Sequence, residues 1–176
     1  SKPINSMSDF NGLKFRVPKN KVMIATLKAF GAEPIPLAWS ETPTALQTGT
    51  IDASDNGTGT IKSMKFYEFA ENLVILEYFS GTSPLLASDR FMSKLNDSQR
   101  AAVQKAADEA GAYMYDFMKD DLDSLRAWLT SEGGMKRSDP DRAPFIKEAQ
   151  KIQDQFSKDA SPEFIALLKE IRAAAN

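Results

Sequence analysis

Arg16 has the residue type and position best suited to bind an anion, because it stands near the end of a short apolar segment that Pro18 closes. A guanidinium offers paired N–H donors that match both oxygens of a carboxylate. Trp39 and Asn56 follow the next two short apolar segments. An indole face could cover the apolar body of a small acid or stack on the guanidinium, and an amide both donates and accepts. The three residues outline an anion receptor.

Three further residues, Lys19, Asp55 and Tyr78, are candidates for the same site. Asp55 could accept a hydrogen bond from a ligand hydroxyl or hold a cation, and its alternative role is that of a solvated loop carboxylate. Trp39 has core packing as its alternative, and Asn56, which precedes a glycine, could simply form a turn.

Catalysis is the competing interpretation. The sequence has no cysteine and no histidine, which excludes thiol nucleophiles, Cys or His zinc sites and histidine proton relays within this chain. Glu41, Asp52 or Asp55 could still act as a general base beside an arginine-held acid. Nothing in the sequence supplies a second catalytic group, so we expect no enzyme, no cofactor and no metal.

Composition limits the class of protein. The 176 residues are 42% hydrophobic and 26% charged, which suits one domain or one large lobe with a real core. A net charge of -2 argues against nucleic acid as a partner, because no positive field attracts phosphates. No stretch approaches the roughly 20 apolar residues of a membrane span.

The first half of the chain alternates short strand and helix signals. Strands are predicted at residues 13–17, 35–37 and 51–54, the second at a sheet edge because it contains two prolines. Helices are predicted after Asn20, after Ser40 and from Gly57 onward. This order predicts a small, mostly parallel sheet covered by helices.

The second half changes character. Strands are predicted at residues 73–79 and 83–88, followed by the capping-box sequence Asn96 to Gln99. Apolar residues then recur at helical spacing up to Gly133, which predicts one helix of about 50 Å or, alternatively, two antiparallel helices broken near Gly111. Two shorter helices are predicted from about Asp141 and from Ser161.

Several motifs in this order resemble one family, the solute-binding subunits of tripartite ATP-independent periplasmic (TRAP) transporters. The resemblance extends over nearly the whole chain, but the beginning of the family's sequence is missing. It lies in residues 10–18, 30–34, 39–41, 45–52, 64–68 and 96–99. We therefore expect a carboxy-terminal fragment.

The resemblance implies an α/β fold: a periplasmic binding protein-like (type II-like) lobe with a small mixed, mostly parallel sheet flanked by helices, plus a long lobe-spanning helix. The amino-terminal lobe would be largely absent. Residues 1–81 would form the substrate-binding second lobe. Residues 82–130 would supply a crossing strand and the long helix toward the missing lobe, and residues 131–176 would pack back as carboxy-terminal helices.

The resemblance also implies a function: capture of a small organic acid and its delivery to the integral membrane subunits of a secondary transporter. Arg16 occupies the position of the family's carboxylate-binding arginine, Trp39 that of an aromatic facing the cleft, and Asp55 a position where the family more often has glutamate. The expected location is the periplasm, with the signal peptide outside this sequence. A carboxylate-sensing receptor domain is the alternative, and the identity of the acid is not specified.

Overall fold

A three-stranded parallel sheet lies at the centre of the computed structural model, which describes residues 2–79, 81 and 83–174. Its order is β2 (Glu33–Pro36), β1 (Lys14–Val17), β3 (Ala53–Ser54). β1 is central and its last three residues are buried. β2 takes the edge because its two prolines cannot donate to a second neighbour. The predicted parallel sheet is confirmed.

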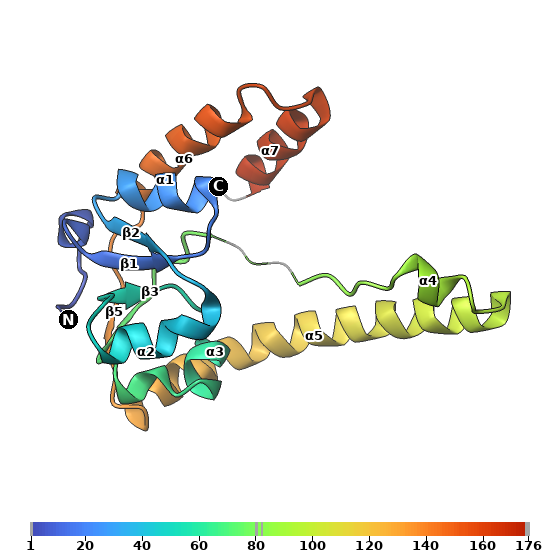
Figure 1. Cartoon of the computed structure of the whole chain (residues 1–176), viewed down its shortest axis with the longest axis horizontal. Helices are drawn as coiled ribbons and strands as arrows, with labels where there is room; N and C mark the ends of the chain where they lie inside the picture. The colour runs from blue at the N-terminus through green and yellow to red at the C-terminus, as the bar shows by residue number, and fades with distance from the viewer. Residues whose placement is uncertain (1, 80, 82, 175–176) are drawn as a thin grey trace.

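Helices cover both faces of this sheet. α1 (Lys21–Ala29) lies on one face, and α2 (Thr42–Gln47) and α3 (Thr58–Ser63) on the other (Figure 1). Asn20 caps α1 as predicted, its side chain accepting from the backbone N–H of Val22 and Met23 at 2.9 and 3.1 Å. The prediction that Ser40 caps the next helix is wrong. A 3₁₀ turn, η2 (Trp39–Glu41), precedes α2, and the carboxylate of Glu41 accepts from the backbone N–H of Ala38 at 3.0 Å.

A second, two-stranded sheet corrects the remaining strand predictions. β4 (Asn72–Val74) pairs in parallel with β5 (Lys136–Ser138). β4 is shorter than the predicted strand 73–79, because its partner β5 ends at Ser138, opposite Val74, and Glu77 further along adopts a positive φ of 51°. β5 was not predicted, since its polar residues show no apolar alternation. The described residues of 83–88 form no strand, since they have no neighbouring strand to pair with.

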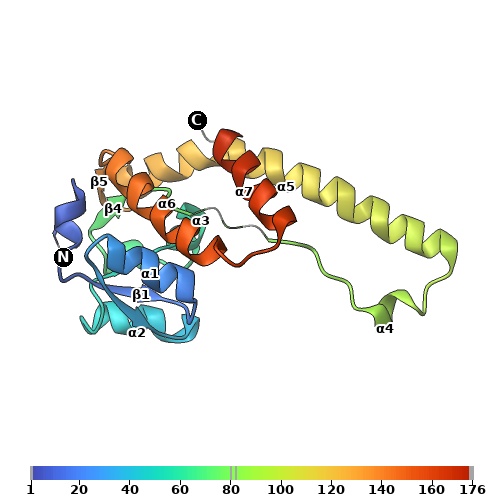
Figure 2. The same cartoon turned by 90° about the horizontal axis from the view of Figure 1, so that it is seen from above.

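One continuous helix, α5 (Asp97–Ser131), follows the short α4 (Asp89–Met92) and projects far beyond the sheets (Figures 1 and 2). The predicted capping box is present, with Asn96 and Gln99 exchanging side-chain-to-backbone bonds of 2.9 and 3.0 Å. The helix passes through Gly111, so the broken-helix alternative is wrong. None of the helices in the described part of the chain has the length and apolar character of a membrane span.

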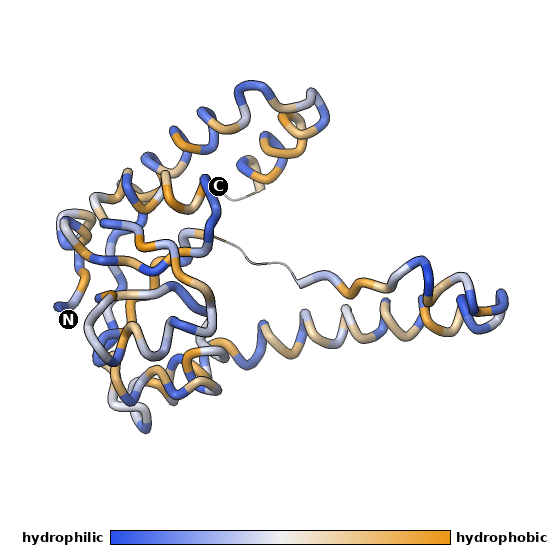
Figure 3. Tube along the Cα trace, in the orientation of Figure 1, coloured by the Kyte–Doolittle hydropathy of each residue, from blue (hydrophilic) through white to orange (hydrophobic). Residues whose placement is uncertain are grey.

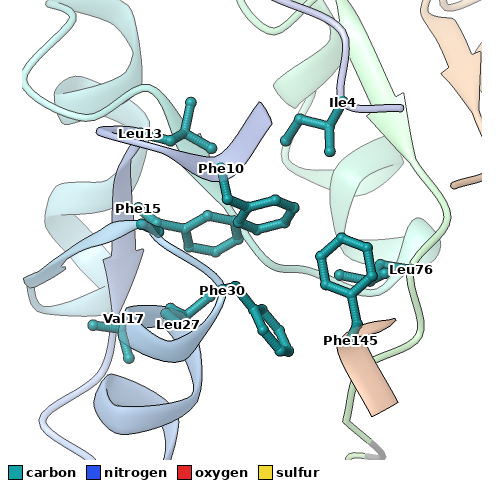
Figure 4. Close-up of a cluster of buried hydrophobic side chains, with 10 residues drawn as sticks. Ile4, Phe10, Leu13, Phe15, Val17, Leu27, Phe30, Leu76 and Phe145 are labelled. Carbon is teal, nitrogen blue, oxygen red and sulfur yellow. The ribbon is translucent and has the colours of Figure 1, made fainter. Parts of the chain in front are cut away.

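The last two helices, α6 (Ala143–Ser157) and α7 (Pro162–Ala174), form a pair in which α6 packs on α1. Phe145 of α6 joins Phe10 and Phe30 in the main core, with ring centroids 5.3 and 5.0 Å away (Figure 4). Apolar residues continue along the projecting part of α5 (Figure 3), and several of them are exposed: Tyr113, Met114, Tyr115, Phe117 and Met118. The core therefore belongs to the sheets and their helices, and these side chains on the outer part of α5 are left exposed by the residues that the structure describes.

Candidate ligand-binding site

Arg16 lies at the carboxyl end of the central strand β1, in register with Ile35 of β2 and Ser54 of β3. Only 8% of the residue is exposed, and it is the only charged residue in the buried class among those that the structure describes. Its Nε and Nη2 donate to the carbonyl oxygen of Leu37 at 3.3 and 3.1 Å. No carboxylate of the described chain pairs with it. The side-chain hydrogen bonds of this largely buried cation thus go to a neutral carbonyl oxygen.

Trp39 lies beside this cation. The guanidinium carbon of Arg16 is 5.6 Å from the indole centroid, within the range of a cation–π contact. The ring also packs against Phe66, at 5.9 Å between centroids, yet 41% of the residue stays exposed. The indole is therefore oriented by two neighbours and still presents surface to a ligand, which differs from complete core packing.

Asp55 and Asn56 follow β3 at the same edge of the sheet, since Ser54 pairs with Arg16. The Asn56 amide donates to the Ser54 hydroxyl at 3.1 Å. Asp55 accepts a 2.6 Å hydrogen bond from the Tyr78 hydroxyl. The structure thus brings Arg16, Asp55, Asn56 and Tyr78 together from three segments of the chain.

Burial, and next the negative charge of Asp55, raise the pKa of Tyr78 well above its usual range, while the nearby Arg16 acts in the opposite direction. The hydroxyl therefore stays protonated at neutral pH and donates to Asp55.

The remaining candidates are placed differently. Lys19 is exposed in the loop between β1 and α1, with no hydrogen bond or ion pair to the described residues. Glu41 closes the turn before α2. Asp52 precedes β3 and accepts a hydrogen bond from the backbone N–H of Lys14 at 2.9 Å, so it lies at the amino end of the strands, opposite Arg16. Of the three carboxylates considered as general bases, Asp55 is the one that directly follows the register partner of Arg16, Ser54.

A cavity of about 450 Å³ lies between β3 and the β4 segment. Asp55, Asn56 and Tyr78 line it, but Arg16, Trp39 and Lys19 do not. Most of the other lining side chains are apolar, among them Phe10, Phe15, Ile61, Phe66, Leu73 and Leu76. Arg16 and Trp39 therefore lie outside this cavity, which is bounded mainly by side chains of the apolar core.

Three charged residues of the cavity lining were missed from the sequence: Lys2, Glu77 and Arg126. Glu77 receives hydrogen bonds from Arg126 of α5 and, at 3.0 Å, from Arg142 just before α6. These partners stand 49 and 65 positions away, so no local pattern could have revealed the cluster. Across the described residues, no group of three or more acidic side chains gathers in the way that a metal site requires.

Comparison with known sequences gives consistent matches. The model of bacterial extracellular solute-binding proteins, family 7 (DctP), matches residues 1–159. The chain is 33% identical over 168 residues to the sialic acid-binding periplasmic protein SiaP of Vibrio cholerae, covering 96% of this chain and 52% of that protein. It is 31% identical over 172 residues to the 2,3-diketo-L-gulonate-binding periplasmic protein YiaO of Escherichia coli, with coverage of 96% and 52%. The chain thus spans about half the length of these relatives, which are binding proteins and not enzymes.

Solved structures agree. A TRAP periplasmic solute-binding protein from Ochrobacterium anthropi, crystallised with L-fuconate, superposes with a TM-score of 0.86 at 32% identity, covering 99% of this chain and 56% of that one. A second, from Xanthobacter autotrophicus with β-D-galacturonate, gives 0.83 at 26% identity, with coverage of 98% and 57%. The fold, the motif order and these matches together show that this chain belongs to the DctP family of TRAP-type extracellular solute-binding proteins and contains a single lobe of their fold.

Proposed function

We propose that this chain is the substrate-binding second lobe of a periplasmic protein that captures a small organic acid and delivers it to the integral membrane subunits of a TRAP transporter. Arg16 anchors the ligand carboxylate. Trp39 covers the apolar part of the ligand, and Asn56, Asp55 and Tyr78 contact its polar groups. Lys19 lies at the rim and adds positive charge.

The observation that supports this proposal most directly is the state of Arg16. Burying a cation without a counter-ion costs free energy, and such groups normally have a paired anion. Here the guanidinium is 8% exposed, is held by a carbonyl oxygen and an indole, and has no carboxylate partner in the described chain. A bound carboxylate supplies the missing charge with a geometry that matches the guanidinium.

The relatives support an acid as ligand. SiaP is named for sialic acid and YiaO for 2,3-diketo-L-gulonate, and the matched crystal structures contain L-fuconate and β-D-galacturonate. All four compounds carry one carboxylate and several oxygens. The shared element of recognition is then the carboxylate, which is the group that Arg16 suits.

We also propose that a second lobe forms the other half of the ligand-binding cleft. The exposed apolar residues along α5 form a surface that a second lobe would cover. Closure of two lobes around the acid is favoured when the ligand binds the closed state better than the open one. An isolated second lobe therefore binds acids much more weakly than the complete protein does.

Titration calorimetry of the complete two-lobed protein with a panel of carboxylates tests the proposal. We expect stoichiometric binding without turnover, and a loss of roughly 100-fold or more in affinity for Arg16→Ala, because a paired charged hydrogen bond is removed. Arg137→Ala is the matched control, since that exposed arginine pairs only with its neighbour Asp139. Unchanged acid binding in Arg16→Ala contradicts the proposal, and so does turnover of a bound acid.

A further inference from the structure

Asp55 is a carboxylate that the anchoring role of Arg16 does not explain. It lies directly after β3, one residue beyond the register partner of Arg16, and it lines the cavity. Its Oδ2 accepts from Tyr78 at 2.6 Å. Within the described chain it has no other hydrogen bond and no ion pair, including none with Arg16. One carboxylate oxygen therefore remains free to accept from a ligand.

Tyr78 fixes the position of this carboxylate. Its ring packs edge-on against Phe30, at 5.9 Å between centroids, and against Phe79 at 5.3 Å. The ring also lies against the main core cluster. Because neighbouring side chains hold the ring in place, its hydroxyl group has a fixed position. The hydrogen bond from this hydroxyl therefore orients the Asp55 carboxylate before a ligand binds.

Two opposite charges thus stand at one edge of the sheet without neutralising each other. Tyr78 lies close enough to both that Asp55 and Arg16 influence its ionisation in opposite directions. A ligand bound by its carboxylate to Arg16 must place some other group toward Asp55. A hydroxyl there donates a charge-assisted hydrogen bond. A second carboxylate there meets the like charge of Asp55, which forms no ion pair within the described residues.

We propose that Asp55, oriented by Tyr78, is a specificity-determining residue that accepts a hydrogen bond from a ligand hydroxyl and rejects a second carboxylate at the same point. This inference rests on the proposed function, because it takes Arg16 as the anchor. It narrows the ligand to hydroxylated monocarboxylic acids and excludes the matching dicarboxylic acids. The discrimination comes from like-charge repulsion as much as from attraction to the hydroxyl.

Matched acids test this directly in calorimetry of the complete two-lobed protein. One series is D-gluconate, hexanoate and D-glucarate, and a second is 4-hydroxybutyrate, butyrate and succinate. The three acids of each series have the same number of carbon atoms. Each series compares a hydroxylated monocarboxylic acid with an unhydroxylated acid and with a dicarboxylic acid. In at least one series we expect the hydroxylated acid to bind roughly 10- to 100-fold more tightly than both counterparts, as for hydrogen bonds to charged acceptors.

The variant Asp55→Asn removes the charge and keeps the shape. It should weaken binding of the hydroxylated acid about tenfold and strengthen binding of the dicarboxylic acid, because an amide can donate to a carboxylate. Tyr78→Phe should weaken binding of the hydroxylated acid by a smaller factor and leave the dicarboxylic acid weakly bound, because Asp55 loses its orienting donor but keeps its charge. Asp52→Asn, at the opposite edge of the sheet, should leave the ratio unchanged. The melting temperature of each variant checks that it is folded.

Opposite shifts for the two acids in Asp55→Asn support the inference, because a merely structural role would weaken both. Tighter binding of the dicarboxylic acid by the wild type overturns it, as does an unchanged ratio in Asp55→Asn. Arg16→Ala separates this outcome from failure of the proposed function: binding of every acid disappears if only the specificity inference is wrong, and persists if the anchor itself is wrong. Binding of no acid by the wild type refutes both.

Discussion

Glu77 provides a test of how the chain is fixed where it leaves β4. Its φ of 51° lies in the left-handed region, which is unfavourable for a residue with a side chain. Its carboxylate receives hydrogen bonds from Arg126 and Arg142. The two variants Glu77→Ala and Glu77→Gly both remove the carboxylate, but only glycine also removes the backbone strain.

The structure sets the sizes of the two effects. The Arg126 side chain is 14% exposed and its Nε is buried without a hydrogen-bond partner, whereas Glu77 is 43% exposed. Because the pair is partly exposed, loss of the Glu77 carboxylate should lower the unfolding free energy by about 2 kcal/mol, toward the low end of the range for hydrogen bonds to charged groups. Glycine recovers about 1 kcal/mol of left-handed strain. We expect Glu77→Ala to lose about 2 kcal/mol of unfolding free energy and Glu77→Gly about 1 kcal/mol.

Urea denaturation followed by circular dichroism measures both variants, and an unchanged m-value validates the comparison. Inside a helix or strand, glycine is less stable than alanine by roughly 0.5–1 kcal/mol, so the expected order here is the reverse of the usual one. Equal stability of the two variants, or greater stability of alanine, refutes the left-handed conformation. A loss below about 0.5 kcal/mol in both shows that the ion pairs behave as exposed surface pairs.

Three further outcomes follow from single contacts. Because folding raises the pKa of Tyr78, the protonated hydroxyl stabilises the fold fully below the unfolded-state pKa of about 10, and this stabilisation falls as the pH rises further. In denaturation measured as a function of pH, Tyr78→Phe should lose less unfolding free energy at alkaline pH than the wild type does. Asn96→Ala removes the cap of α5 and should cost about 1 kcal/mol in denaturation; an unchanged midpoint contradicts the cap. Gly31 has a φ of 96° and lies beside the flexible Asn11 side chain. Gly31→Ala should therefore lower the unfolding free energy by at least about 1 kcal/mol, mostly through backbone strain. The additional substitution Asn11→Ala frees the space beside residue 31 but should not restore the lost stability.

Local signals in the sequence were sufficient for most of the helices and for the first sheet, but they missed the short α4 and misplaced the start of α2. The side chain of Asn20, the capping box at Asn96 and the prolines of β2 act over two to four residues, so their effects are visible in the sequence itself. Apolar spacing predicted the long helix α5 and left a break near Gly111 as the alternative; the helix is continuous, because a single glycine costs too little to interrupt 35 residues.

The strand errors arose where pairing depends on distant segments. β5 has a polar sequence and is a strand only because β4 lies beside it, whereas residues 83–88 have suitable composition but no neighbouring strand. A strand requires a partner to satisfy its backbone groups, and the identity of that partner is a property of the fold.

The same division holds for the candidate site. The sequence by itself determined the family, the anion-binding residue types and the parallel order that gathers Arg16, Asp55 and Asn56 at one edge, because the carboxyl ends of parallel strands meet there. Only the tertiary structure decided that Arg16 is buried without a carboxylate partner among the described residues, that Tyr78 donates to Asp55 and that Lys19 is exposed. Burial and pairing depend on contacts between side chains that are dozens of residues apart in the sequence. Local residue spacing does not specify those contacts.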